Sequence, residues 1–267
     1  FISIPKLNII KPGWLNVVSY LSTYKNLQND LLDWISNKQA DKICLFEVDK
    51  LNTEIREKSY MTIFEKVTSE GLWIYHYVPS VSNFANFVES MEEIYRLKKI
   101  IQNSNNFWEI VNSIAIVSYK RNLFGFSKNL CEVIVNKICH SKDIMVKIEG
   151  LDALERLNLL NKSTLSYITA NSEFKTERFY SHVTYYLLKK DLAVENLPFI
   201  LQCYIDRKKP WYESDSSIDM DFKIICESLK DYNALTLIFK TFSENEISIY
   251  NQNELVENLI KNSIEIY

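Results

Sequence analysis

Histidine is the side chain that most often transfers protons near neutral pH, and this chain of 267 residues contains only three. One of them ends the segment Arg178-Phe-Tyr-Ser-His182, which we expect to be helical. Residues four apart share one face of a helix, so Arg178 and His182 could together bind a phosphate. The alternative is two polar residues on the exposed side of an amphipathic helix, and this alternative is favoured.

Cysteine and histidine also bind metals, and Cys131, Cys139 and His140 lie close together in the sequence. A structural zinc site normally shows two close ligand pairs, such as CxxC and HxxxH. No CxxC pattern occurs, and no second histidine lies near His140. Cys139 directly follows the apolar stripe that ends at Ile138, so we expect a small core residue. We predict no metal ion and no cofactor.

Two groups of carboxylates have the composition of a cation site but not its spacing. Glu47 and Asp49 would end a strand if residues 43–48 formed one, and carboxylates there can bind Mg²⁺. A clear second strand with a partner carboxylate is missing, so a solvated surface is favoured. The acidic run at residues 213–221 lacks the central glycine of a calcium loop and is expected to be a surface loop.

Aromatic side chains are abundant, with 16 Tyr, 14 Phe and 5 Trp, and most are expected to fill the core. The neighbours Tyr185-Tyr186 and Trp211-Tyr212 cannot all point inward from one helix face. Tyr and Trp are enriched at protein interfaces because they combine a large apolar area with a polar tip. We therefore predict that Tyr185, Trp211 and Tyr212 contact a partner.

Glycine is scarce: the chain has four, where average usage of about 7% would give roughly nineteen. Glycine-rich phosphate loops need several glycines close together, because the backbone must approach the phosphate. The four glycines are widely separated, which excludes Walker-type and Rossmann-type nucleotide binding. Together with only five prolines, this scarcity favours long helices and short connections.

Helices therefore have to position these side chains, and the clearest helical pattern lies at residues 126–160. Phe126, Leu130, Ile134 and Ile138 recur every four residues, and a second apolar stripe starts at Ile144 after a polar break. Two stripes joined by a short break predict an antiparallel helical hairpin. Similar units of about 30 to 40 residues continue toward the C-terminus, the range of α-solenoid repeats, although no repeat consensus is present.

The first eighty residues are ambiguous. Residues 1–11 are expected to be extended, and the runs 43–48 and 72–78 are short, β-branched and aromatic, as strands are. A helix over residues 53–69 between them would complete a βαβ unit. The alternative is that both runs are buried helix segments, because periodicity cannot separate the two at this length. The second interpretation is favoured.

The composition limits the partners and the compartment. A net charge of −3 gives no reason to expect nucleic acid, and no apolar run reaches the length of a membrane helix. Five scattered cysteines are typical of reduced thiols, so we expect a cytoplasmic protein. The chain starts without an initiator Met, and we expect a fragment of a longer, microbial protein.

These patterns predict a mainly α-helical protein, an irregular solenoid-like array of antiparallel helix pairs. Residues 1–79 would form a helical or small α/β segment and residues 80–267 the array, within one continuous globular unit. The predicted function is a non-enzymatic scaffold or sensor module that binds another protein or the remainder of its own parent chain. The alternative is a phosphodiester-cleaving or nucleotide-processing enzyme that uses Arg178 and His182.

Overall fold

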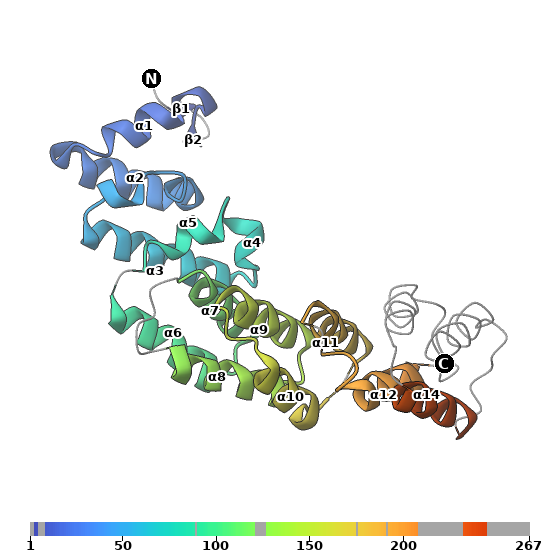
Figure 1. Cartoon of the computed structure of the whole chain (residues 1–267). Helices are drawn as coiled ribbons and strands as arrows, with labels where there is room; N and C mark the ends of the chain where they lie inside the picture. Colours follow the sequence, from blue (N-terminus) through green and yellow to red (C-terminus); the bar gives the residue numbers. More distant parts are fainter. Residues whose placement is uncertain are drawn as a thin grey trace. The chain divides into compact units, whose positions relative to one another are not determined.

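The computed structural model describes residues 3–4, 9–88, 90–120, 127–174, 176–190, 192–207 and 232–244. These residues are mostly helical, with many contacts between helices, so the predicted fold class is confirmed (Figure 1). The chain forms two compact units. Unit 1 consists of Phe1–Ile138 and Glu149–Leu159, and unit 2 of Cys139–Ile148 and Leu160–Tyr267.

Unit 1 starts with a short antiparallel hairpin of β1 (Ser3–Ile4) and β2 (Ile9–Ile10), so these four residues are extended, as expected. The turn η1 (Pro12–Trp14), α1 (Leu15–Leu21) and α2 (Lys25–Ile43) follow. Helix α2 has a kink at Gln39, and the Gln39 side chain accepts a hydrogen bond from the Ile10 backbone N–H at 2.6 Å. This contact ties the hairpin to α2.

The βαβ unit is not found in residues 43–78. Ile43 ends α2, and the chain then turns into η2 (Val48–Lys50) and α3 (Thr53–Ser69). The second run contains the short helix α4 (Ile74–Tyr77). The β-branched and aromatic residues of both runs reflect burial at helix ends, since Ile43, Phe46 and Ile74 lie in the core. Neither run is a strand: the second contains a short helix, as the alternative interpretation predicted, whereas residues 44–46 of the first form a turn.

The centre of unit 1 is α7 (Phe107–Ser118), in which every residue from Ile110 to Ser118 is buried. Helix α3 packs on α7, and so do α5 (Val81–Ala85) and α6 (Met91–Asn103). Side chains of Ser90 and Asn106 cap the N-termini of α6 and α7, which explains where these helices begin.

The predicted hairpin at residues 126–160 is confirmed as α8 (Ser127–His140) and α9 (Ile144–Arg156). Gly150 of α9 allows a close approach to α8. A Cβ at this position would lie 2.6 Å from Cγ1 of the buried Ile138, which is closer than two non-bonded carbon atoms can approach. The glycine is therefore required here for packing, and its backbone conformation is ordinary helix.

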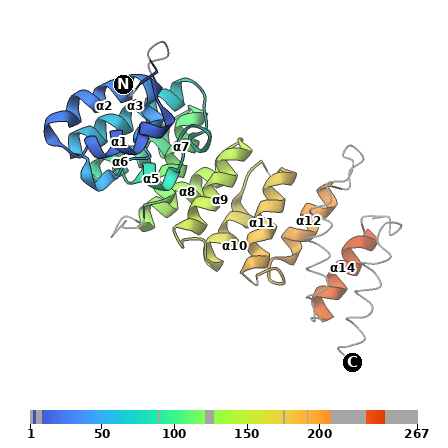
Figure 2. The ribbon, with the colours of Figure 1, turned by 90° about the horizontal axis from the view of Figure 1, so that it is seen from above.

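Unit 2 is built from helices that pack on their neighbours in chain order (Figure 2). They are α10 (Lys162–Asn171), α11 (Glu177–Lys189), α12 (Leu197–Arg207) and α14 (Tyr232–Glu244). Buried apolar residues such as Leu165, Phe179, Leu187 and Ile238 form the core of this unit. Across the described part of the chain, no helix is both long and apolar enough to cross a membrane.

Candidate functional site

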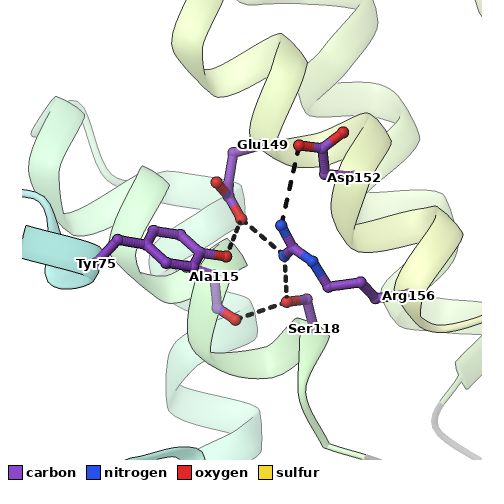
Figure 3. Close-up of polar contacts among 6 residues, drawn as sticks. All are labelled: Tyr75, Ala115, Ser118, Glu149, Asp152 and Arg156. Carbon is purple, nitrogen blue, oxygen red and sulfur yellow. Dashed lines mark hydrogen bonds and ion pairs between the residues drawn. The ribbon is translucent and has the colours of Figure 1, made fainter. Parts of the chain in front are cut away.

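Buried ionisable groups are candidates for function, because burial of a charge is unfavourable unless partners offset it. In unit 1 such groups gather around Glu149 of α9 (Figure 3). Glu149 is almost completely buried, and its Oε1 accepts hydrogen bonds from Tyr75 Oη at 3.0 Å and from Arg156 Nη1 at 2.9 Å. We call the residues Tyr75, Ser118, Glu149, Asp152 and Arg156 the Glu149 cluster.

Arg156 binds several groups of this cluster at once. Its Nη1 also donates to Ser118 Oγ at 2.7 Å, and the Ser118 hydroxyl in turn donates to the Ala115 carbonyl (Figure 3). Its Nη2 lies 3.9 Å from Oδ2 of Asp152. The guanidinium is 5.1 Å from the ring centroid of Tyr119, within the range of a cation–π contact. The cation is therefore surrounded by matched partners.

The electrostatics of the Glu149 cluster follow from its burial. Burial raises the pKa of the Glu149 carboxyl above its usual value, and the opposing attraction of Arg156 does not fully cancel that increase. Burial also raises the pKa of the Tyr75 phenol, and repulsion by the Glu149 carboxylate raises it further. Tyr75 therefore remains a hydrogen-bond donor at neutral pH. The cluster joins α4, α7 and α9 and is suited to a structural role.

None of these residues is among the sequence-predicted site residues. A signal for them is present in the sequence: Glu149, Asp152 and Arg156 have the spacing i, i+3, i+7, which places them on one helix face. Five of the thirteen residues of α9 are charged, so the spacing alone does not indicate that these charges are buried. Tyr75 could not be joined to them from the sequence, because its segment was ambiguous between strand and helix.

A second buried charge, Lys147, lies in unit 2. Its side chain is fully buried, Nζ donates to the Glu173 carbonyl at 2.5 Å, and Nζ lies 4.6 Å from the ring centroid of Phe179. Glu173 makes two further contacts. Its N–H donates to the Cys139 carbonyl at 2.8 Å, and its Oε1 lies 3.0 Å from His140 Nδ1. We call these five residues the Lys147 cluster.

Cys139 is a buried core residue, as predicted, and Cys131 is half-buried. Burial raises the pKa of the Cys139 thiol, against the opposing influence of the Ser172 hydroxyl and the Lys147 ammonium. The thiol is therefore the dominant form at neutral pH and is a poor nucleophile. Among the residues that the structure describes, no group of three or more His, Cys, Asp or Glu side chains could hold a metal ion.

The predicted residues Arg178, His182 and Tyr185 all lie on α11. Arg178 is exposed, and His182 is half-buried with its ring 5.6 Å from the ring of Tyr186 in an edge-on arrangement. Tyr185 is 52% exposed, and its ring also contacts Tyr186, at 5.2 Å. The structure thus places Arg178 and His182 on one helix, while their catalytic role stays a prediction.

The other predicted positions divide into two groups. Glu47 and Asp49 are exposed at η2, where Glu47 forms an ion pair with Lys50 at 2.5 Å, so they belong to a solvated surface. Trp211, Tyr212 and the acidic run at residues 213–221 lie outside the described residues. No protein family, curated protein or solved structure matches this chain. Function is therefore inferred from the residues alone.

Proposed function

We propose that this chain is a non-enzymatic protein–protein interaction module, a solenoid-like scaffold or sensor segment of a larger cytoplasmic protein. The observation that carries the proposal is that charged side chains are buried while large aromatic side chains are exposed. Glu149 and Lys147 are buried and bound to partners within their own units. Large aromatic side chains are displayed instead, as expected for a binding surface.

One exposed aromatic residue of unit 2 is Phe174, in the segment between α10 and α11. Its φ of +49° is left-handed, a conformation that costs a bulky residue on the order of 1 kcal/mol. The side chain is nevertheless exposed, with Nζ of Lys142 at 5.2 Å from its ring centroid. The Lys147 cluster holds the adjacent Glu173, which offsets the strain. Strain of this kind is typical of residues that bind a ligand.

Tyr185 supports the same proposal from the next helix. It extends from α11 on the side away from the buried Val183 and Leu187, and its ring rests against Tyr186. An exposed tyrosine held by a neighbouring ring loses little conformational freedom on binding, which favours affinity. We include Trp211 and Tyr212 in the proposed contact surface because Trp and Tyr are enriched at protein interfaces.

The test is site-specific photo-crosslinking in the cells that produce the protein. A photoreactive phenylalanine analogue replaces Tyr185, and in a matched control it replaces Asn136, an exposed polar residue of α8. The proposal expects a defined protein adduct at position 185 that is absent at position 136. Identical adducts at both positions, or none at position 185, would contradict it. A Phe174→Ser change should weaken the adduct at position 185 if the two residues contact the same partner.

A further inference from the structure

The outer face of α11 in unit 2 combines basic side chains with a tyrosine. Three of these side chains are exposed and the fourth is half-buried. We call this set the α11 stripe; it consists of Arg178, His182, Tyr185 and Lys189. Their spacing alternates between three and four residues, so they lie on one face of the helix. The buried residues Val183 and Leu187 lie on the opposite face, which packs into unit 2.

A single buried ring supports three of the four residues of the α11 stripe. This ring belongs to Tyr186, which is 6% exposed. It lies 5.6 Å from the ring of His182 and 5.2 Å from the ring of Tyr185, edge-on in both cases. Nζ of Lys189 lies 5.9 Å from the same ring centroid, within the range of a cation–π contact. Side chains held in this way lose less conformational freedom when they bind a partner.

The exposed charges of α11 differ in sign from those of other helices. Among the side chains of α11 that the structure describes, the exposed charged ones are Arg178 and Lys189, both positive. The one acidic residue in the sequence of this helix is Glu177, its first residue. Helix α3, in contrast, exposes charges of both signs, with Glu57 directly before Lys58. The α11 stripe therefore presents positive charge, which attracts an acidic partner.

The position of Arg178 also favours an acidic partner. Arg178 is the second residue of α11, a helix of 13 residues. The dipole of a helix disfavours a cation in the first turn and favours an anion there. Arg178 is therefore at a position where its charge does not stabilise its own helix. A carboxylate of a partner at this end would be attracted by Arg178 and by the helix dipole together.

We propose that the α11 stripe binds an acidic segment of the partner protein, with carboxylates at Arg178 and Lys189 and an apolar side chain against Tyr185. This inference rests on the proposed function and names the chemistry of its partner. The two cations are about 16 Å apart along the helix axis, at about 1.5 Å per residue. An extended peptide covers that distance with about five residues. Surfaces that bind nucleic acid are more basic, and the net charge of this chain is −3.

Fluorescence polarisation of a labelled peptide with the whole chain tests this proposal. The probe is the peptide Glu-Glu-Phe-Glu-Glu with a neutral fluorophore, and the control peptide has Gln in place of every Glu. At about 50 mM salt the acidic peptide should bind with a Kd on the order of 100 µM. The control peptide should bind about tenfold more weakly, because it lacks the carboxylates. Salt of about 500 mM should weaken binding of the acidic peptide by screening.

Variants of the chain then locate the binding site. Arg178→Glu should weaken binding of the acidic peptide about tenfold, because it places a like charge on the α11 stripe. The new glutamate suits the first turn of the helix, so the variant should remain folded, and circular dichroism checks this. The matched control is Lys99→Glu, which makes the same charge change at an exposed lysine of α6. It should change the Kd by less than about twofold.

Three results would overturn the proposal. They are no binding of the acidic peptide up to about 1 mM, an equal loss of binding in Lys99→Glu, and tighter binding of a labelled oligothymidine, which would assign the α11 stripe to single-stranded nucleic acid. The outcome is separable from that of the proposed function. A protein adduct at position 185 that persists in Arg178→Glu would keep the interaction module and reject the acidic partner. Peptide binding without any adduct at position 185 would contradict the proposed function instead.

Discussion

Lys147 and Glu149 lie two residues apart on α9, and both are buried, but they are stabilised in different ways. Residues at this spacing do not share a helix face, and the two belong to different units. Glu149 has an opposite charge, Arg156, and a phenol as partners. The contacts of Lys147 include a backbone carbonyl and the face of a ring. Glu149 thus has a half-buried cation as a partner, whereas the backbone carbonyl and the ring that contact Lys147 are neutral groups.

The two clusters should respond differently when a partner is removed. Loss of one member of a buried ion pair leaves an uncompensated charge, whereas loss of a cation from neutral partners leaves only weak hydrogen-bond deficits. The Glu149 cluster should therefore be more sensitive to substitution than the Lys147 cluster.

The largest effect is expected for Arg156→Ala. It leaves the Glu149 carboxylate buried without its cation, and we expect a loss of about 3 to 5 kcal/mol in the free energy of unfolding. Urea denaturation followed by circular dichroism measures this loss. Arg178→Ala, which removes an exposed arginine of α11, should change it by less than about 0.5 kcal/mol. If both variants lose similar amounts, the Glu149 cluster is not a stabilising pair.

A smaller effect is expected for Gly150→Ala, beside Glu149 on α9. Alanine favours a helix by about 1 kcal/mol relative to glycine, but here its Cβ would collide with Ile138. We expect a net loss of about 1 to 2 kcal/mol, measured in the same way. Gly13→Ala is the steric control, because nothing lies within 4 Å of a Cβ at that position. A stabilised Gly150→Ala variant would contradict this expectation and would show that α8 can shift to accommodate the added Cβ at little cost.

Lys147→Met sharpens the comparison from the other side. Methionine keeps most of the apolar stem and removes the charge, so the Glu173 carbonyl loses a donor and Phe179 loses a cation. Because the carbonyl and the ring are neutral groups, the expected loss from these two contacts is about 1 kcal/mol. Lys162→Met, on the exposed surface of α10, provides the control with almost no change. A loss as large as that of Arg156→Ala would remove the distinction between the clusters.

The smallest expected effect concerns pH. Because the pKa of Glu149 is raised in the folded state, folding favours its protonated form, and this contribution to stability is present below the unfolded pKa of about 4.5. The contribution is lost as the pH rises through the folded pKa. Wild type should therefore gain stability relative to Glu149→Gln as the pH falls from 7 toward 4.5. Urea titrations of both proteins at several pH values measure this difference, and a relative loss would show that attraction by Arg156 outweighs burial.

The sequence is sufficient to predict the helices but not the clusters that join them. The hairpin of α8 and α9 follows from apolar residues at regular spacing, since that spacing is a local property of the chain. The runs around Ile43 and Ile74 are too short for apolar periodicity to distinguish a strand from a helix. Their burial depends on contacts with residues distant in the sequence. Cys139 could be assigned to the core because its neighbours are apolar.

The buried charges are harder to predict because their partners are distant in sequence. Tyr75 and Glu149 are separated by most of unit 1, and Lys147 and Glu173 by a whole helix. A charged residue next to an apolar stripe is usually predicted to lie at the edge of the stripe, with its charge exposed to solvent. The sequence alone cannot show that Lys147 and Glu149 are both buried, on different sides of the same helix.

The division of α9 between the units has a consequence for how the protein can be cut or recombined. The chain passes from one unit to the other after Ile138, after Ile148 and after Leu159, so neither unit is a continuous stretch of sequence. No single break yields both units whole, and a truncation at any of these three points removes part of a core. A single genetic crossover therefore cannot exchange either unit as a whole, and we expect the units to be inherited together.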